Sequence, residues 1–337
     1  MKLYKIIKPL IFIALTSAFF IVPWVFESTR DYAPGIAVFS GIIFAVFIGN
    51  PFQKYTGKIT SHLLGAAIVA MGCGMNLIEV LKAGANGIIY TVVGITLGIS
   101  LGVFIGKKLK LSKNSIYLLS VGTSICGGSA IAAAAPVLKA KPHDIALASA
   151  TVFTLNAVAL LIFPEIGHAL GFTQEQFGYW AALGIHDTSS VVGASMTYGE
   201  TALAVGTTVK LARSLWIVPV TIYLSCFVAD KEEGEKNKIR IRIPWFIPGF
   251  LIAAAIVTWV PQYLPQSADF IRCSGGMIKN ISKYMMITTL FLIGANLSKD
   301  KLKELGIRPV IHGIILWLIL ASIWCVAIFH NLVNCTI

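Results

Sequence analysis

Three short stretches of this sequence combine residue types that could bind or carry charge. The first reads Cys-Gly-Gly-Ser at 126–129, and the second reads His-Asp-Thr-Ser-Ser at 186–190. The third holds Lys210 and Arg213, which are three residues apart and therefore lie on one face of a helix. Glycines let the main chain approach a ligand closely, hydroxyls donate hydrogen bonds, and two cations attract an anion. We therefore expect a binding site for a small anion.

The pair His186 and Asp187 stands in the middle of an apolar segment. A charged side chain at the centre of a bilayer costs about 3 kcal/mol or more, so its default interpretation is functional. Asp187 could carry a proton or coordinate a cation, and His186 could accept a proton or donate to an anion. The alternative is a structural pair. For Lys210 and Arg213, the alternative is a place near the interface from which the side chains reach water.

The expected sites can be stated residue by residue. The anion site draws on hydroxyl, thiol, glycine and cationic residues of the three stretches, namely Ser124, Cys126, Gly127, Gly128, Ser129, Thr188, Ser189, Ser190, Lys210 and Arg213. The ion-coupling candidates are His186, Asp187, Asn76 and Asn296. For the two asparagines, helix capping is an equal interpretation.

Metal, cofactor and enzyme chemistry are not expected. The six cysteines form no C-x-x-C pair, so neither a zinc site nor a disulfide framework is predicted. A phosphate-binding G-x-x-x-x-G-K-[ST] loop is also missing from the sequence, as is the G-x-S-x-G motif of serine hydrolases. An intramembrane enzyme built on His186, Asp187 and Ser189 is therefore the weakest alternative.

Composition shows which solvent surrounds these residues. Of 337 residues, 56% are hydrophobic and 12% are charged, whereas a soluble domain has about 25% charged residues. The net charge is +12, and most cations stand in short runs between apolar segments. By the positive-inside rule these runs are cytoplasmic loops and the N-terminus is cytoplasmic, so we expect a multi-pass protein of the bacterial inner membrane and no nucleic-acid partner.

Up to eleven hydrophobic segments follow one another with short linkers. The first covers Pro9–Phe26, and each later one is near the roughly 20 residues that a spanning helix needs. The later segments are 34–50, 59–81, 85–106, 113–138, 143–163, 174–198, 200–228, 245–264, 281–298 and 309–333. Short linkers predict a single transmembrane domain over 1–337.

Internal similarity suggests duplication. The motif G-x-N-L followed by a charged stretch and a glycine occurs at Gly74–Gly84 and again at Gly294–Gly306. The stretches 122–133 and 184–195 are each followed by an acidic residue and the sequence A-L-A-x-x-T. We therefore predict an all-α inverted-repeat transporter fold, with one repeat near 34–163 and the other near 174–333.

Charge and symmetry agree if segments 113–138 and 174–198 are re-entrant hairpins. The loop with Lys139 and Lys141 then faces the cytoplasm, as the positive-inside rule requires. This arrangement predicts about nine spanning helices plus two broken elements. Helices that cross fully and unwind in the middle are the alternative, and the sequence does not decide between the two.

Four motifs carry a resemblance that covers nearly the whole chain. MGCGMN (71–76), SICGGSAIAA (124–133), GIHDTSSVVGAS (184–195) and VKLARSLW (209–216) closely resemble the YeiH-like family of bacterial inner-membrane proteins, which are often labelled sulfate exporters. That family is grouped with inverted-repeat carriers that include sodium–bile acid symporters and sodium–proton antiporters. The resemblance implies a secondary transporter with a mobile core and a more static panel, and it does not establish the substrate.

The leading hypothesis is thus a secondary-active carrier of a small anion such as sulfate or a sulfonate. Transport would proceed by alternating access. The protein would be either an exporter or a carrier coupled to protons or sodium. A channel or a structural membrane component is the alternative. The expected partners of the protein are the small anion and the lipid bilayer, and a homodimer is compatible with the sequence.

Overall fold

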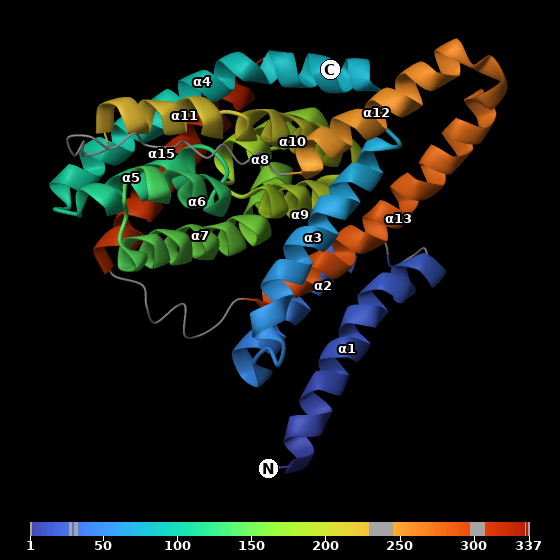
Figure 1. Ribbon diagram of the computed structural model, residues 1–337, viewed down its shortest axis with the longest axis horizontal. Helices are drawn as coiled ribbons and strands as arrows, with labels where there is room; N and C mark the ends of the chain where they lie inside the picture. The colour runs from blue at the N-terminus through green and yellow to red at the C-terminus, as the bar shows by residue number, and fades with distance from the viewer. Residues whose placement is uncertain are drawn as a thin grey trace. The chain divides into compact units, whose positions relative to one another are not determined.

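The computed structural model describes residues 2–26, 29, 33–228, 245–296, 307–333 and 335. Within these ranges every regular element is a helix (Figure 1). Six helices are long and apolar enough to cross a membrane, and the total of about nine spanning helices stays a prediction. Most of the predicted repeat at Gly294–Gly306 lies outside the described residues.

The chain divides into two compact units. The first unit comprises Met1–Leu81 and Pro244–Asp300, and the second comprises Lys82–Ile243 and Lys301–Ile337. In the first unit, α13 packs against α1, α2 and α3, and α3 packs against α12. Its elements are α1 (Lys2–Val25), α2 (Ala33–Ile43), the π-helical turn η2 (Phe44–Ile48), α3 (Gln53–Gly72), α12 (Phe246–Tyr263), the short η4 (Pro265–Ser267) and α13 (Ala268–Ala295).

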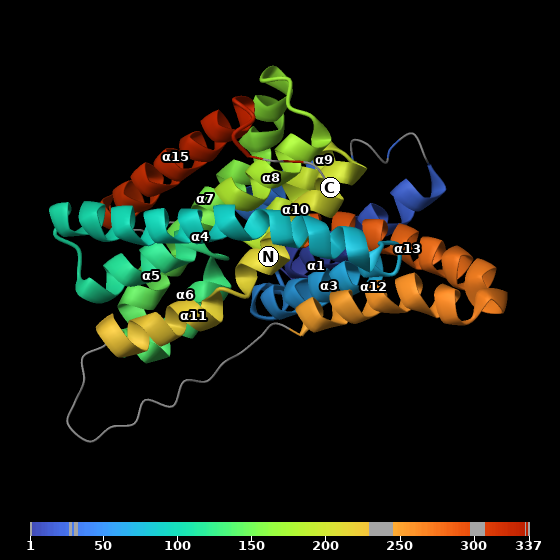
Figure 2. The same ribbon diagram turned by 90° about the horizontal axis from the view of Figure 1, so that it is seen from above.

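The second unit is organised around α7, a helix of 28 residues. α7 packs against α5, α6 and α9, and α15 packs against α5, α7 and α8 (Figure 2). Besides most of α4 (Leu77–Lys108), the unit contains α5 (Lys113–Ser124), α6 (Gly128–Val137), α7 (Pro142–Ala169), α8 (Gln174–Gly184), α9 (Thr188–Tyr198), α10 (Glu200–Ser214), α11 (Ile217–Tyr223), the π-helical η3 (Leu224–Val228) and α15 (Ile307–Phe329).

Helices α5 and α6 form a helical hairpin, hereafter hairpin 1. At the start of α5, the hydroxyls of Ser112 and Ser115 donate to Asp144 Oδ1 at 2.7 and 2.5 Å, and Asp144 stands in the first turn of α7. A Cβ atom at Gly122 would lie 2.9 Å from the side chain of Ile131, which shows that the two arms fold back on each other. Hairpin 1 therefore begins and ends at the N-terminal end of α7.

Helices α8 and α9 form hairpin 2, which opens at the other end of α7. The main-chain N–H of Thr201 donates to Gln174 Oε1 at 2.9 Å, so the start of α8 lies beside the start of α10. Tyr198 at the end of α9 donates to the carbonyl of Phe172 at 2.6 Å, and its ring stacks on Phe177 at 3.8 Å. The two hairpins thus enter from opposite ends of α7 (Figure 1), and each of the two segments folds back on itself.

Local sequence explains where each hairpin turns. Gly127 has φ +65°, a left-handed conformation that glycine adopts without strain, and α6 starts directly after it. In hairpin 2 the turn is made by Asp187, whose side chain accepts from the N–H groups of Ser189 and Ser190 and so starts α9. We call residues 125–127 and 185–187 the hairpin tips.

Close packing of α8 on α10 sets the position of Lys210 and Arg213. A Cβ atom at Gly178 would lie 2.8 Å from Val205 Cβ and 2.9 Å from the carbonyl oxygen of Ala202. The two main chains can approach this closely only because residue 178 has no side chain.

We expect Gly178→Ala to lower the free energy of unfolding by about 1–3 kcal/mol, because the added methyl group overpacks the contact between α8 and α10. The matched control is Gly57→Ala in α3, where nothing lies within 4 Å of the added Cβ. Thermal unfolding of the detergent-purified protein measures both. Equal unfolding midpoints for the two variants would contradict the packing described above.

Candidate binding site at the hairpin tips

The two hairpin tips meet beside the middle of α7. A Cβ atom at Gly127 would lie 3.4 Å from Asp187 Cβ, so the tips are in contact. Asn156, near the midpoint of α7, accepts from the main-chain N–H groups of His186 and Asp187 at 3.1 and 3.2 Å. Four helix ends therefore converge here: the C-termini of α5 and α8 and the N-termini of α6 and α9.

Lys210 joins the two tips. Its Nζ donates to the carbonyl of Ile125 in hairpin 1 at 2.9 Å and to the carbonyl of Ile185 in hairpin 2 at 2.7 Å. A third, longer contact of 3.4 Å reaches the carbonyl of Ala182. The side chain is fully buried. Three acceptors around one nitrogen match the three N–H groups of an ammonium ion.

Arg213, also fully buried, binds the same two helix ends. Its Nε and Nη2 donate to the carbonyl of Ser124 at 2.8 and 2.5 Å, and Nη1 donates to the carbonyls of Ala182 and Leu183 at 3.0 and 2.6 Å. The indole of Trp317 donates to the carbonyl of Gly184 at 3.2 Å. Side chains thus satisfy the carbonyls that the end of α8 leaves without an intrahelical partner, and cations lie where the helix dipoles are negative.

The two N-terminal ends differ from each other. At α9, Asp187 Oδ2 accepts from the N–H groups of Ser189 and Ser190 at 3.1 and 3.3 Å, and the hydroxyl of Ser189 donates to the same oxygen. At α6, Gly127 offers no side-chain cap. Gly128 is half-buried and Ser129 is exposed, so the first turn of α6 reaches the surface of the protein.

Several buried polar atoms at the tips have unused hydrogen-bonding capacity. Both ring nitrogens of His186 and the Nδ2 of Asn156 lack a hydrogen-bond partner within the described part of the chain, as does the hydroxyl of Ser124. His186 is 2% exposed, and its ring contacts Trp317 edge to face at 6.5 Å. Buried polar groups in folded proteins are normally paired, so these atoms mark a place where water or a ligand can bind.

The structure brings the ten anion-site candidates together in the second unit, on the tips, their flanking turns and α10. Ser129 is exposed, Gly128 and Ser189 are half-buried, and the other seven are buried. Lys210 and Arg213 were expected to face the substrate. Instead, the hydrogen bonds of both side chains go to main-chain carbonyls at the ends of α5 and α8. The two cations therefore contribute positive charge next to the tips, while their donors are occupied by the protein.

The four ion-coupling candidates are divided between the units. His186 and Asp187 lie at the tip of hairpin 2, whereas Asn76 and Asn296 belong to the first unit. Asn76 is exposed and accepts from the N–H of Ile78 at 2.9 Å, which caps the start of α4. Asn296 follows α13 and bonds with Thr56 at 2.5 Å and Thr60 at 3.1 Å on α3. The side chain of Asn76 therefore makes the capping contact of the alternative interpretation, whereas the side chain of Asn296 joins the end of α13 to α3.

Sequence reasoning missed Asn156 and Trp317. Asn156 is 2% exposed in an otherwise apolar stretch of α7. A polar side chain in the middle of an apolar segment is the signal that singled out His186 and Asp187. The same signal applies to Asn156. Trp317 carries no such signal, because an aromatic residue in an apolar helix is ordinary.

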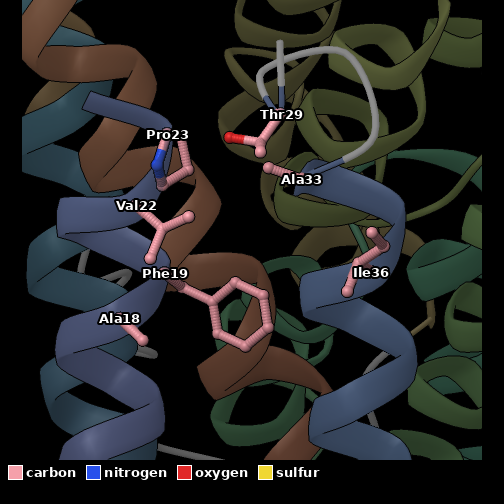
Figure 3. Close-up of a pocket in the computed structure, with 7 residues that line it drawn as sticks. All are labelled: Ala18, Phe19, Val22, Pro23, Thr29, Ala33 and Ile36. Carbon is pink, nitrogen blue, oxygen red and sulfur yellow. The ribbon is translucent and has the colours of Figure 1, made fainter. Parts of the chain in front are cut away.

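A cavity in the first unit has a different character from the hairpin tips. It is an apolar cavity of about 330 Å³ between α1 and α2, lined by Ala18, Phe19, Val22, Pro23, Thr29, Ala33 and Ile36 (Figure 3). Among the described lining residues, Thr29 alone carries a side-chain hydroxyl. Such a lining suits a hydrocarbon chain and offers an anion no charge.

Arg213→Lys should destabilise the protein by at least about 2 kcal/mol, because one ammonium cannot replace a planar group that bonds to three carbonyls of two hairpins. The control exchanges the cations in the other direction at an exposed position, Lys107→Arg in the last turn of α4, where a change within about 0.5 kcal/mol is expected. Thermal unfolding in detergent distinguishes them. A wild-type midpoint for Arg213→Lys would show that the carbonyl contacts add no stability.

Sequence comparison with known proteins identifies the family of this chain. The family model described as "Conserved hypothetical protein 698" matches residues 10–313. Relatives include a UPF0324 membrane protein of Bdellovibrio bacteriovorus, 50% identical over 85% of this chain and 86% of the relative, and one of Bacteroides thetaiotaomicron, 45% identical over 86% and 84%. A third, from Geobacter sulfurreducens, is 44% identical over 87% and 89%. No solved structure matches. With its apolar helices, the chain is a multi-pass membrane protein and belongs to the conserved hypothetical protein 698 family of UPF0324 membrane proteins.

Proposed function

We propose that this protein is a secondary carrier that moves a small anion across the bacterial inner membrane by alternating access, with its N-terminus in the cytoplasm. The observation that carries the proposal is the meeting of two re-entrant hairpins, from opposite ends of α7, around Lys210 and Arg213. Carriers built from inverted repeats bind substrate at the repeat interface near the bilayer midplane, where broken helices end. The hairpins at 113–137 and 174–198 would be corresponding parts of the two repeats.

The chemistry of the tips supports an anion. The first turn of α6 presents main-chain N–H groups at Gly128 and Ser129, and a helix N-terminus attracts negative charge. The buried cations Lys210 and Arg213 lie behind the tips and raise the positive potential there. Sulfate and sulfonates, which the family resemblance suggests, match this donor set.

Coupling is assigned to the tip of hairpin 2. Asp187 is half-buried, so an ion from water could reach its carboxylate, and His186 next to it has unpaired ring nitrogens within the described residues. Proton or sodium binding at Asp187 would change the charge beside the substrate. The division of the chain into two units supplies the two bodies that alternating access needs: the hairpin-bearing unit as the mobile core and the other unit as the panel.

The proposal predicts saturable uptake of radiolabelled sulfate or methanesulfonate into proteoliposomes, with a rate that responds to a proton or sodium gradient. In a variant without native cysteines, a thiol at Ser129→Cys should react with an impermeant reagent, and the transported anion at ten times its Kd should slow that reaction about tenfold. The control thiol, Gln266→Cys in η4, is exposed and lies outside the hairpins. Its labelling rate should not change. Equal protection of both thiols, or absence of flux for both anions, would refute the proposal.

A further inference from the structure

The side chains in and next to the hairpin tips carry more positive than negative charges. Lys210 and Arg213 contribute two positive charges, both fully buried. Asp187 contributes one negative charge on the same site. Among the described residues, the remaining polar groups at the site include the amide of Asn156, the thiol of Cys126 and the hydroxyl of Ser124, and none of these carries a formal charge. One positive side-chain charge therefore remains.

The protonation states behind this count follow from the contacts. Lys210 meets three carbonyl oxygens, which accept hydrogen bonds and do not donate them, so the ammonium form fits. Asp187 Oδ2 accepts from two N–H groups and one hydroxyl, which fits a carboxylate. His186 is buried with no acceptor near either ring nitrogen among the described residues, so it counts as neutral, because an unpaired buried imidazolium would be costly.

The helix ends do not offset this remaining charge. Each helix end carries about half an elementary charge, negative at the C-terminus and positive at the N-terminus. The C-termini of α5 and α8 and the N-termini of α6 and α9 all meet at the tips. Their partial charges cancel as a set, so the side-chain charge alone decides what the site lacks.

Building on the proposed function, we infer that the substrate is a monovalent oxyanion, and that Asp187 sets this valence by neutralising one of the two buried cations. A monoanion at the open first turn of α6 makes the loaded site electrically neutral. A dianion such as sulfate leaves one unpaired negative charge, and an unpaired charge inside a membrane protein is unfavourable. Ser129, which is exposed, offers a hydroxyl to the oxyanion.

Methanesulfonate and sulfate form a matched pair of probes, because both are compact tetrahedral sulfur oxyanions that differ by one charge. In proteoliposomes with the wild-type protein, we expect uptake of methanesulfonate to exceed that of sulfate at equal concentration. In Asp187→Asn the side-chain charge rises by one. The ratio of sulfate to methanesulfonate uptake should then rise by about tenfold or more, because the two cations balance the charge of sulfate and exceed that of methanesulfonate by one.

The variant is expected to fold, because asparagine caps a helix as well as aspartate does. Glu200→Gln is the control: it removes one negative charge at the exposed start of α10 and should leave the ratio unchanged. A wild-type preference for sulfate overturns the inference without any variant, as does an unchanged ratio in Asp187→Asn, and in both cases the carrier function stands. Uptake of neither anion overturns the carrier function together with the inference.

Discussion

Main-chain carbonyls at the buried ends of α5 and α8 must find donors inside the protein. In hydrocarbon, each unsatisfied carbonyl would cost several kcal/mol, and no water is at hand to replace it. Lys210 and Arg213 meet this need for both hairpins from one face of α10, and Trp317 completes the end of α8. Two further contacts hold these hydrogen bonds in place. They are the close packing of α8 on α10 at Gly178 and the contact of hairpin 2 with Asn156. A helix can stop in the middle of this fold because those cations are there.

The same arrangement leaves the opposite helix ends less complete. Carbonyl ends are closed by fixed cations, whereas the N-terminal ends are served by Asp187 at α9 and by no side-chain cap at α6. This difference separates a structural half of the site from an accessible half. It also gives the buried cations their place in the proposed mechanism, as a source of potential behind the ligand rather than as its direct contacts.

Much of the fold could be predicted from local sequence. The breaks at Gly127 and Asp187 follow from a left-handed glycine and a capping carboxylate, both readable in place. The predicted segment 281–298 began too late, because α13 starts at Ala268. Its early turns carry Arg272 and Lys279, which lower the apolar signal while the helix continues. The roles of the cations could not be read at all: Lys210 bonds to residues 85 and 25 positions away, and no local pattern encodes such a pairing.

In the proposed carrier, the two hairpins open at opposite faces of the membrane, and the tips of both bond to Lys210. The sidedness of two exposed loop positions tests this directly: Lys141→Cys, beside the opening of hairpin 1, and Leu170→Cys, beside the opening of hairpin 2. In oriented membrane vesicles, an impermeant thiol reagent added to one side should label one of the two and not the other, and addition to the other side should reverse the pattern. Labelling of both positions from the same side would contradict the account.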